Sequence, residues 1–381
     1  MGMKNEAKKK SGFARFYKIC PVRHSLGILA ALVIVLHLST RNNYGFTNSL
    51  WKGFVRPLHR HLSVFCSRFP FSVAELLIAM LAAGLLAFLI YSLFKLRKPG
   101  ERWKRIYRLF QTLLCTGLLI YGGFCLLWGT YYYGSSFVDS AGLSDEPVSL
   151  EELTAVTKYF AGLSNEYGEK VRRDENGFYS PDRREILEKS KELYLETEKE
   201  IPCLEGPDIC PKGIFFSRVM SYIDFTGFFF PFTGEANVNM DFPPPLFAST
   251  VAHELAHQRG AAREQDANFI AVMASLNYGD RDFCYSAALL AYTHLGNALR
   301  KADYAAWEEI YDSLSENVLR DFALDRYYWR QFETPVQKVS NTVYEGFLQS
   351  YGQELGRRSY GACVDLLVNY YCDEAAEAEL N

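Results

Sequence analysis

Several common signatures are missing from this 381-residue sequence. It contains no Gly-rich phosphate loop and no GxSxG nucleophile motif, so nucleotide binding and serine-hydrolase chemistry have no support. None of its nine cysteines stands in a CxxC pair, which argues against a cysteine-ligated zinc site. Cys203 and Cys210 bracket a loop and are either a disulfide or two thiols. Histidine is scarce too, because only three of the seven histidines follow residue 139.

Acidic residues are nearly absent from the first part of the chain. Residues 1–139 hold 19 Lys and Arg against 4 Asp and Glu, whereas the remainder holds 22 against 40. A basic, apolar part followed by an acidic, polar part predicts a membrane anchor over residues 1–134 and a soluble domain over 135–381. The acidic domain argues against nucleic acid as a partner, because phosphate binding needs clustered Lys and Arg.

Three apolar runs predict transmembrane helices at residues 25–40, 72–94 and 109–129. Basic residues cluster ahead of the first run and again over 95–108. The positive-inside rule places both clusters in the cytoplasm, so a multi-pass protein of the cytoplasmic membrane is expected, with its soluble domain outside. The basic start also resembles a signal peptide, but no small-residue cleavage site follows it, so we expect the first run to be retained.

The soluble part shows mainly helical patterns. Helical periodicity marks residues 148–200, with a charged helix expected at 181–200, and most of the chain after residue 271. Residues 214–240 are instead rich in β-forming side chains, and Pro231 favours an edge strand there, which would either pair with an extended peptide or be a plain buried strand. The expected fold class is therefore α+β, mostly helical, with a small sheet after three transmembrane helices.

Residues 251–271 carry the strongest chemical signal. His253 and His257 would lie about 6 Å apart on one helical face, which lets both imidazoles bind one Zn²⁺. Glu254 stands beside the first histidine, where a carboxylate can take a proton from a water at the metal. These residues form an HExxH motif, a pattern that also arises by chance on surface helices.

A third metal ligand must come from elsewhere. On one straight helix Glu264 would lie about 10 Å beyond His257, too far for metal bonds of about 2 Å. Gly260 allows the chain to turn, and a second helix beginning near Arg263 would return Glu264 to the histidines. Asn268, one turn further on, would then hydrogen-bond the Glu264 carboxylate. The rival third ligands are Asp266, His294 and Glu235.

The run HELAHQRG followed by E-x-x-A-N-F resembles the zincin peptidase clan, in its gluzincin branch with two histidines and one glutamate. More of the chain is similar to a family of uncharacterised bacterial membrane proteins in that clan, known only as a domain of unknown function. In that family Trp-Gly is usually followed two residues later by Asn-Tyr, whereas this chain has Tyr131-Tyr132. The resemblance implies a zincin-like domain and a zinc site, but no particular substrate. The matching pieces are Pro70-Phe71-Ser72 with Glu75, Trp128-Gly129, the run from Phe230 to Asn237, the HExxH stretch, and Ser359-Tyr360-Gly361.

Zincins commonly use a tyrosine, histidine or arginine to stabilise the oxyanion of the reaction. The resemblance therefore makes Tyr360, in the matching Ser-Tyr-Gly, a candidate catalytic residue, with Tyr344 as a second candidate. Either tyrosine would serve equally well in packing.

Two functions of different classes follow from these observations. The first is a membrane-anchored zinc metallopeptidase that hydrolyses an extracytoplasmic protein or peptide, with Glu254 as general base. The second is a non-catalytic membrane receptor or scaffold that binds peptide at a metal-stabilised site. Glu254 favours the enzyme, because a site that only binds needs no base. Both functions imply Zn²⁺, a lipid bilayer and a peptide or protein partner, and neither implies nucleic acid or nucleotide.

Overall fold

The computed structural model describes residues 16–351 and 360–380, and the chain is mostly helical with one small sheet, as predicted. Its residues divide into two compact units, which we describe separately. The first unit contains the chain up to Val55 and the stretch Ala74–Gly134. The second unit contains Arg56–Val73 and the chain from Ser135 onward.

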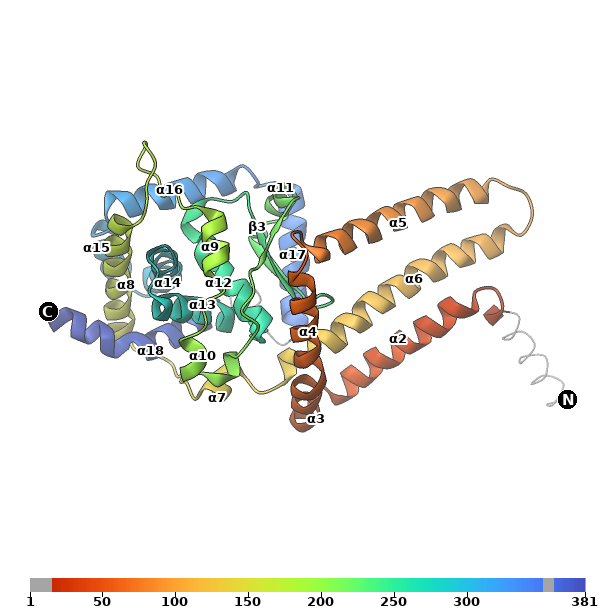
Figure 1. Cartoon of the computed structure of the whole chain (residues 1–381), viewed down its shortest axis with the longest axis horizontal. Coiled ribbons are helices and arrows are strands. Elements are labelled where there is room, and N and C mark those ends of the chain that lie inside the picture. The colour runs from red at the N-terminus through yellow and green to blue at the C-terminus, as the bar shows by residue number, and fades with distance from the viewer. Residues whose placement is uncertain (1–15, 352–359, 381) are drawn as a thin grey trace. The chain divides into compact units, whose positions relative to one another are not determined.

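Three long apolar helices make up most of the first unit (Figure 1): α2 (Pro21–Thr40), α5 (Val73–Leu96) and α6 (Arg102–Leu127). They have 20, 24 and 26 residues, and crossing a bilayer takes about 20 apolar residues. The prediction of three helices long and apolar enough to cross a membrane is therefore confirmed for the described residues. Helix α6 begins earlier than its predicted span because the basic residues 102–108 continue the helix beyond its apolar part.

Close backbone approach and aromatic contacts stabilise the first unit. Helix α2 packs against α6, where a Cβ added to Gly122 would lie 3.1 Å from the Ala30 carbonyl oxygen. Trp128 and Trp51 both contact Tyr131, with ring centroids 4.9 and 5.3 Å apart. The short elements at these ends are α3 (Tyr44–Leu50), the π-helix η1 (Trp51–Val55) and the 3-10 helix η2 (Gly129–Tyr133).

Helix α4 (Arg56–Ser67) and the turn after it belong to the second unit, although the sequence predicts them within the anchor. Arg56 Nη2 donates to the Glu205 carbonyl oxygen at 2.6 Å, and Ser72 Oγ donates to Asn237 Oδ1 at 2.6 Å. These bonds join segments that are far apart in the sequence. Local amino-acid composition does not reveal these hydrogen bonds, so it cannot locate the boundary between the two units.

Helices form most of the second unit. Helix α8 (Leu150–Lys170) begins where its periodicity predicts, because Ser149 and Glu152 form a capping box. The charged helix predicted at 181–200 is interrupted: α9 (Arg183–Lys189) ends early and α10 (Thr197–Glu200) follows after a series of turns. The remaining outer helices are α7 (Phe137–Ala141), α15 (Tyr304–Asp312), α16 (Glu316–Arg330), α17 (Pro335–Ser350) and α18 (Tyr360–Leu380), with the 3-10 helices η3 (Pro202–Leu204) and η4 (Pro244–Leu246).

The sheet has three strands in the order β1-β3-β2. Strand β1 (Lys212–Ile214) runs parallel to β3 (Glu235–Asn239), and β2 (Gly227–Phe230) runs antiparallel to it. The β-rich segment also contains a short helix, α11 (Ser217–Tyr222), which strand propensity alone does not predict. Strand β2 ends directly before Pro231 and lies at the edge of the sheet, the position that the proline favours.

Three helices form the core of the second unit and pack on one another: α12 (Phe247–Arg259), α13 (Glu264–Tyr278) and α14 (Arg281–Ala302). Helix α12 also packs against β2 and β3. It is buried on nearly every side, polar side chains included, which is unusual for a helix in a water-soluble domain. The HExxH residues therefore lie in the interior of this unit.

Candidate metal centre

Gly260 reverses the chain between the two HExxH histidines and the third candidate ligand. Its φ of 109° is left-handed, a conformation open to glycine at little cost, and it caps helix α12. The Ala261 amide donates back to the Ala256 carbonyl at 3.1 Å, which completes the turn. Helix α13 then begins with Glu264, close to the predicted position.

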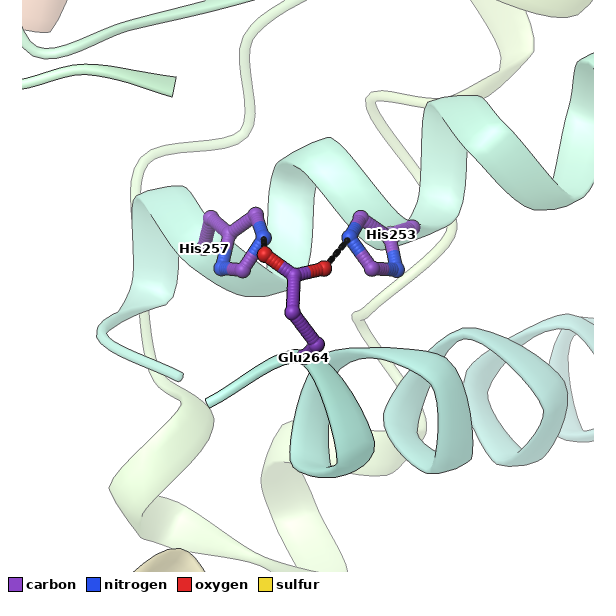
Figure 2. Close-up of side chains that lie close together, drawn as sticks. All are labelled: His253, His257 and Glu264. Carbon is purple, nitrogen blue, oxygen red and sulfur yellow. Dashed lines mark ion pairs between the residues drawn. The ribbon is translucent and has the colours of Figure 1, made fainter. Parts of the chain in front are cut away.

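The structure brings His253, His257 and Glu264 together (Figure 2). The Glu264 carboxylate lies between the two rings, with Oε2 3.2 Å from His253 Nε2 and Oε1 3.7 Å from His257 Nε2. One ligand atom from each residue falls within 4.8 Å of the others. Among the described residues this is the one such group of three metal-ligating side chains.

The two separations between Glu264 and the histidines come near those of a tetrahedral metal site. Bonds of about 2.0–2.1 Å at tetrahedral angles set ligand atoms roughly 3.3 Å apart. The distances of 3.2 and 3.7 Å lie close to that value. Two imidazoles and one carboxylate form a donor set that Zn²⁺ accepts, with a fourth position left for water or substrate.

The far nitrogen of each histidine ring is held by a hydrogen bond. His253 Nδ1 pairs with Asn268 Oδ1 at 2.9 Å, and His257 Nδ1 pairs with the Ala261 carbonyl oxygen. Each bond orients its ring and directs Nε2 toward the cluster. Asn268 therefore supports His253, whereas the sequence predicts it on the Glu264 carboxylate. The difference arises because α13 packs beside α12, so that its second turn reaches the first histidine.

Buried charge couples these three side chains. Burial raises the pKa of Glu264, but its bond to His253 and the two nearby imidazoles outweigh this and lower that pKa to about 2. Burial lowers the pKa of His253, but the Glu264 carboxylate outweighs it, and this pKa is raised. Burial and the charge of His253 lower the pKa of His257 to about 4. Without a metal, the Glu264 carboxylate and the His253 imidazolium therefore each favour the charged form of the other.

Glu254 is buried beside the cluster, and its side chain is incompletely paired. It is only 3% exposed, and no hydrogen-bond partner among the described residues reaches its Oε2. Burial, reinforced by the charge of Glu264, raises its pKa to about 8, although His253 opposes the shift. A buried carboxyl without full hydrogen bonding is costly, and such groups concentrate at functional sites.

Strand β2 lies directly against Glu254. A Cβ added to Gly227 would come within 2.5 Å of Glu254 Oε1 and 2.6 Å of its Cγ. Only glycine therefore fits here without moving the carboxylate. Gly227 could not be recognised from the sequence, because nothing in its neighbourhood indicates that β2 crosses α12 at that point.

Of the two candidate tyrosines, Tyr344 reaches the cluster. Its hydroxyl donates to Glu264 Oε1 at 2.5 Å, and its ring contacts Phe225 with centroids 5.2 Å apart. The side chain of Tyr360 lies outside the described part of the structure. Tyr344 comes from α17, so its role depends on how that helix packs against the sheet segment.

The three rival ligands do not join the cluster. Glu235 Oε1 instead accepts the Val73 amide at 3.1 Å, a bond within the second unit. Asp266 is buried within α13, and burial raises its pKa to about 7. His294 of α14 is near enough for the charge of His253 to help lower its pKa, after burial, to about 4.

Comparison with known proteins gives one match. A family model described as "Protein of unknown function (DUF3810)" matches residues 50–368, which include the cluster, Glu254 and Tyr344. No curated protein and no solved structure matches the chain.

Proposed function

The chain belongs to the DUF3810 family of proteins of unknown function, and we propose that it is a zinc-dependent peptidase anchored in a membrane. The observation that carries this proposal is the buried Glu254 next to three converging ligands. A structural metal site needs ligands alone, whereas hydrolysis also needs a base beside the metal. The incompletely paired Glu254 carboxyl supplies that base.

His253, His257 and Glu264 would hold the metal. When bound, Zn²⁺ lowers the pKa of water and polarises a carbonyl group. Glu254 accepts the proton of the attacking water and then donates it to the leaving amine. Its pKa of about 8 applies to the metal-free protein, and a cation in the cluster would lower it, because nearby positive charge favours the carboxylate.

The arrangement of elements supports a zincin-like domain and a peptide substrate. The metal helix α12 packs under the antiparallel edge strand β2, and Gly227 of β2 touches the base. An extended peptide that adds to β2 would present its backbone carbonyls near Glu254 and the cluster. We propose that this site acts on an extracytoplasmic protein or peptide, because the basic clusters favour an orientation in which the second unit lies outside the cytoplasmic membrane.

Zinc content and peptide turnover test the proposal together. The full-length protein in lipid nanodiscs should contain one zinc per chain and cleave members of a peptide library, and a chelator should abolish the cleavage until zinc is restored. Glu254→Gln preserves size and polarity but cannot take the proton. It should keep its zinc while cleavage falls by about 10²–10⁴-fold.

Glu151→Gln is the matched control, because Glu151 is an exposed glutamate in the first turn of α8, and it should leave cleavage unchanged. Zinc without any peptide cleavage would contradict the enzyme and favour a receptor or scaffold. Cleavage that survives in Glu254→Gln would place the activity at another site.

A further inference from the structure

In the short segment from Phe215 to Tyr222 several apolar side chains are exposed while two serines are buried, although Arg218 is exposed and Met220 is buried. Phe215, Phe216 and Val219 are 84%, 54% and 57% exposed. Ser217 and Ser221, which belong to helix α11 as Val219 does, are buried. A helix on a water-soluble domain normally has the opposite pattern, so the outer face of this segment is suited to a non-aqueous neighbour.

Hydrogen bonds fix this orientation. Ser217 Oγ donates to the Ile214 carbonyl at 2.5 Å and accepts the Met240 amide at 2.7 Å. Ser221 Oγ lies 2.6 Å from the Tyr328 hydroxyl and accepts from Asn239 Nδ2 at 2.9 Å. Turning α11 to bury its apolar face would break these bonds and expose the partners, so the outward aromatics are built into the fold.

The segment lies close in the chain fold to the start of a membrane span. Lys212 of β1 donates to the carbonyl oxygens of Ser67 and Phe69. Phe69 and Phe71 are exposed as well, and helix α5 begins at Val73. Where α5 enters a bilayer, these residues stand at its surface. Phe215 directly follows β1, so it lies at most about 10 Å along the chain from Lys212 at about 3.3 Å per residue.

We infer that Phe215, Phe216 and Val219, together with Phe69 and Phe71, form a membrane-contact patch that inserts into the lipid interface. Aromatic side chains favour the headgroup level of a bilayer, which is several ångströms deep on each side of the hydrocarbon. Exposed Arg68 beside the patch can reach lipid phosphates. The inference does not depend on the proposed peptidase activity.

Such contact has a consequence for access to the metal cluster. The membrane-contact patch is attached to β1, and β1 pairs with β3, which pairs with β2 beside Glu254. A patch held in the interface would keep this sheet close to the bilayer. Polypeptide segments near the membrane would then reach the edge of β2 more readily than soluble proteins would.

Photocrosslinking tests the inference in the full-length protein in nanodiscs. The photoreactive residue p-benzoylphenylalanine is placed at position 215 or, in a second variant, at position 219. Position 304 on α15 serves as control, because Tyr304 is 53% exposed and belongs to a different surface helix. After irradiation, mass spectrometry should find lipid adducts at 215 and 219 in at least tenfold excess over those at 304.

Two results would overturn the inference. Lipid adducts at 215 and 219 no more abundant than at 304 would show that the patch faces water. Adducts to a second copy of the chain in place of lipid, seen as a crosslinked dimer, would show that the patch is a self-association surface. Because these positions are exposed, the substitutions are compatible with folding, and a matching elution profile in detergent verifies this.

Discussion

Helices α5 and α12 differ in which of their side chains are buried. In α5 only Ala74 and Ser92 are buried, and most of its leucines, both of its isoleucines and Phe94 are exposed. In α12 nearly every residue is buried, including Glu254, His257 and Arg259. A helix such as α5, with exposed apolar side chains, is stable only in an apolar solvent. A helix such as α12, with buried polar side chains, is stable only where each polar group has a partner or a function. One chain therefore contains a helix suited to an apolar solvent and a helix suited to a polar protein interior.

We expect the largest effect from an arginine placed in α5. Leu86 is an exposed residue in the middle of α5, and in water Leu86→Arg would be harmless. In a bilayer an arginine at the centre of a span costs about 2.5–3.5 kcal/mol for insertion, so we expect less of the protein in the carbonate-resistant membrane fraction, with α2 and α6 holding the remainder there. Leu150→Arg, on an exposed turn of α8, is the control and should remain in that fraction. Normal membrane recovery of Leu86→Arg would contradict a lipid-facing α5.

Gly227→Ala tests the role of the buried Glu254 in α12. The added methyl group would displace the Glu254 carboxylate, and a shift of about 1 Å at a catalytic group can cost about 10²-fold in rate. Zinc content should not change, because no ligand moves. Gly213→Ala on β1 is the matched control, since its methyl group meets the flexible Met240 side chain. Equal peptide turnover in both variants would remove Glu254 from the mechanism.

Asn268→Ala should give a smaller effect on the metal itself. The variant removes the acceptor that orients His253, and loss of such a supporting bond typically weakens zinc affinity by about 10–100-fold. Competition titration with a fluorescent chelator measures this change. Asn277→Ala on the same helix, where Asn277 bonds Thr197, should leave the affinity unaltered. A similar loss in both variants would indicate that α13 is destabilised as a whole and that Asn268 has no specific role.

Local features of the candidate site were predictable from sequence, and distant contacts were not. The HExxH spacing, the turn at Gly260 and the start of α13 near Glu264 depend on neighbouring residues and on glycine's access to positive φ. The partner of Asn268, the contact of Gly227 with Glu254 and the reach of Tyr344 depend on packing between remote segments. The same limit explains why α4 was expected in the anchor and why α11 was missed within a β-rich stretch. Three apolar runs, by contrast, are visible in composition alone.

Zinc K-edge X-ray absorption on the purified full-length protein tests whether His253, His257 and Glu264 bind zinc. We expect only nitrogen and oxygen atoms around the zinc, at about 2.0–2.1 Å, with the multiple scattering of two imidazoles. Glu264→Ala should lose most of its zinc, because one of three protein ligands is gone. A sulfur shell at about 2.3 Å would contradict the account, as would an unchanged spectrum and full zinc content in Glu264→Ala.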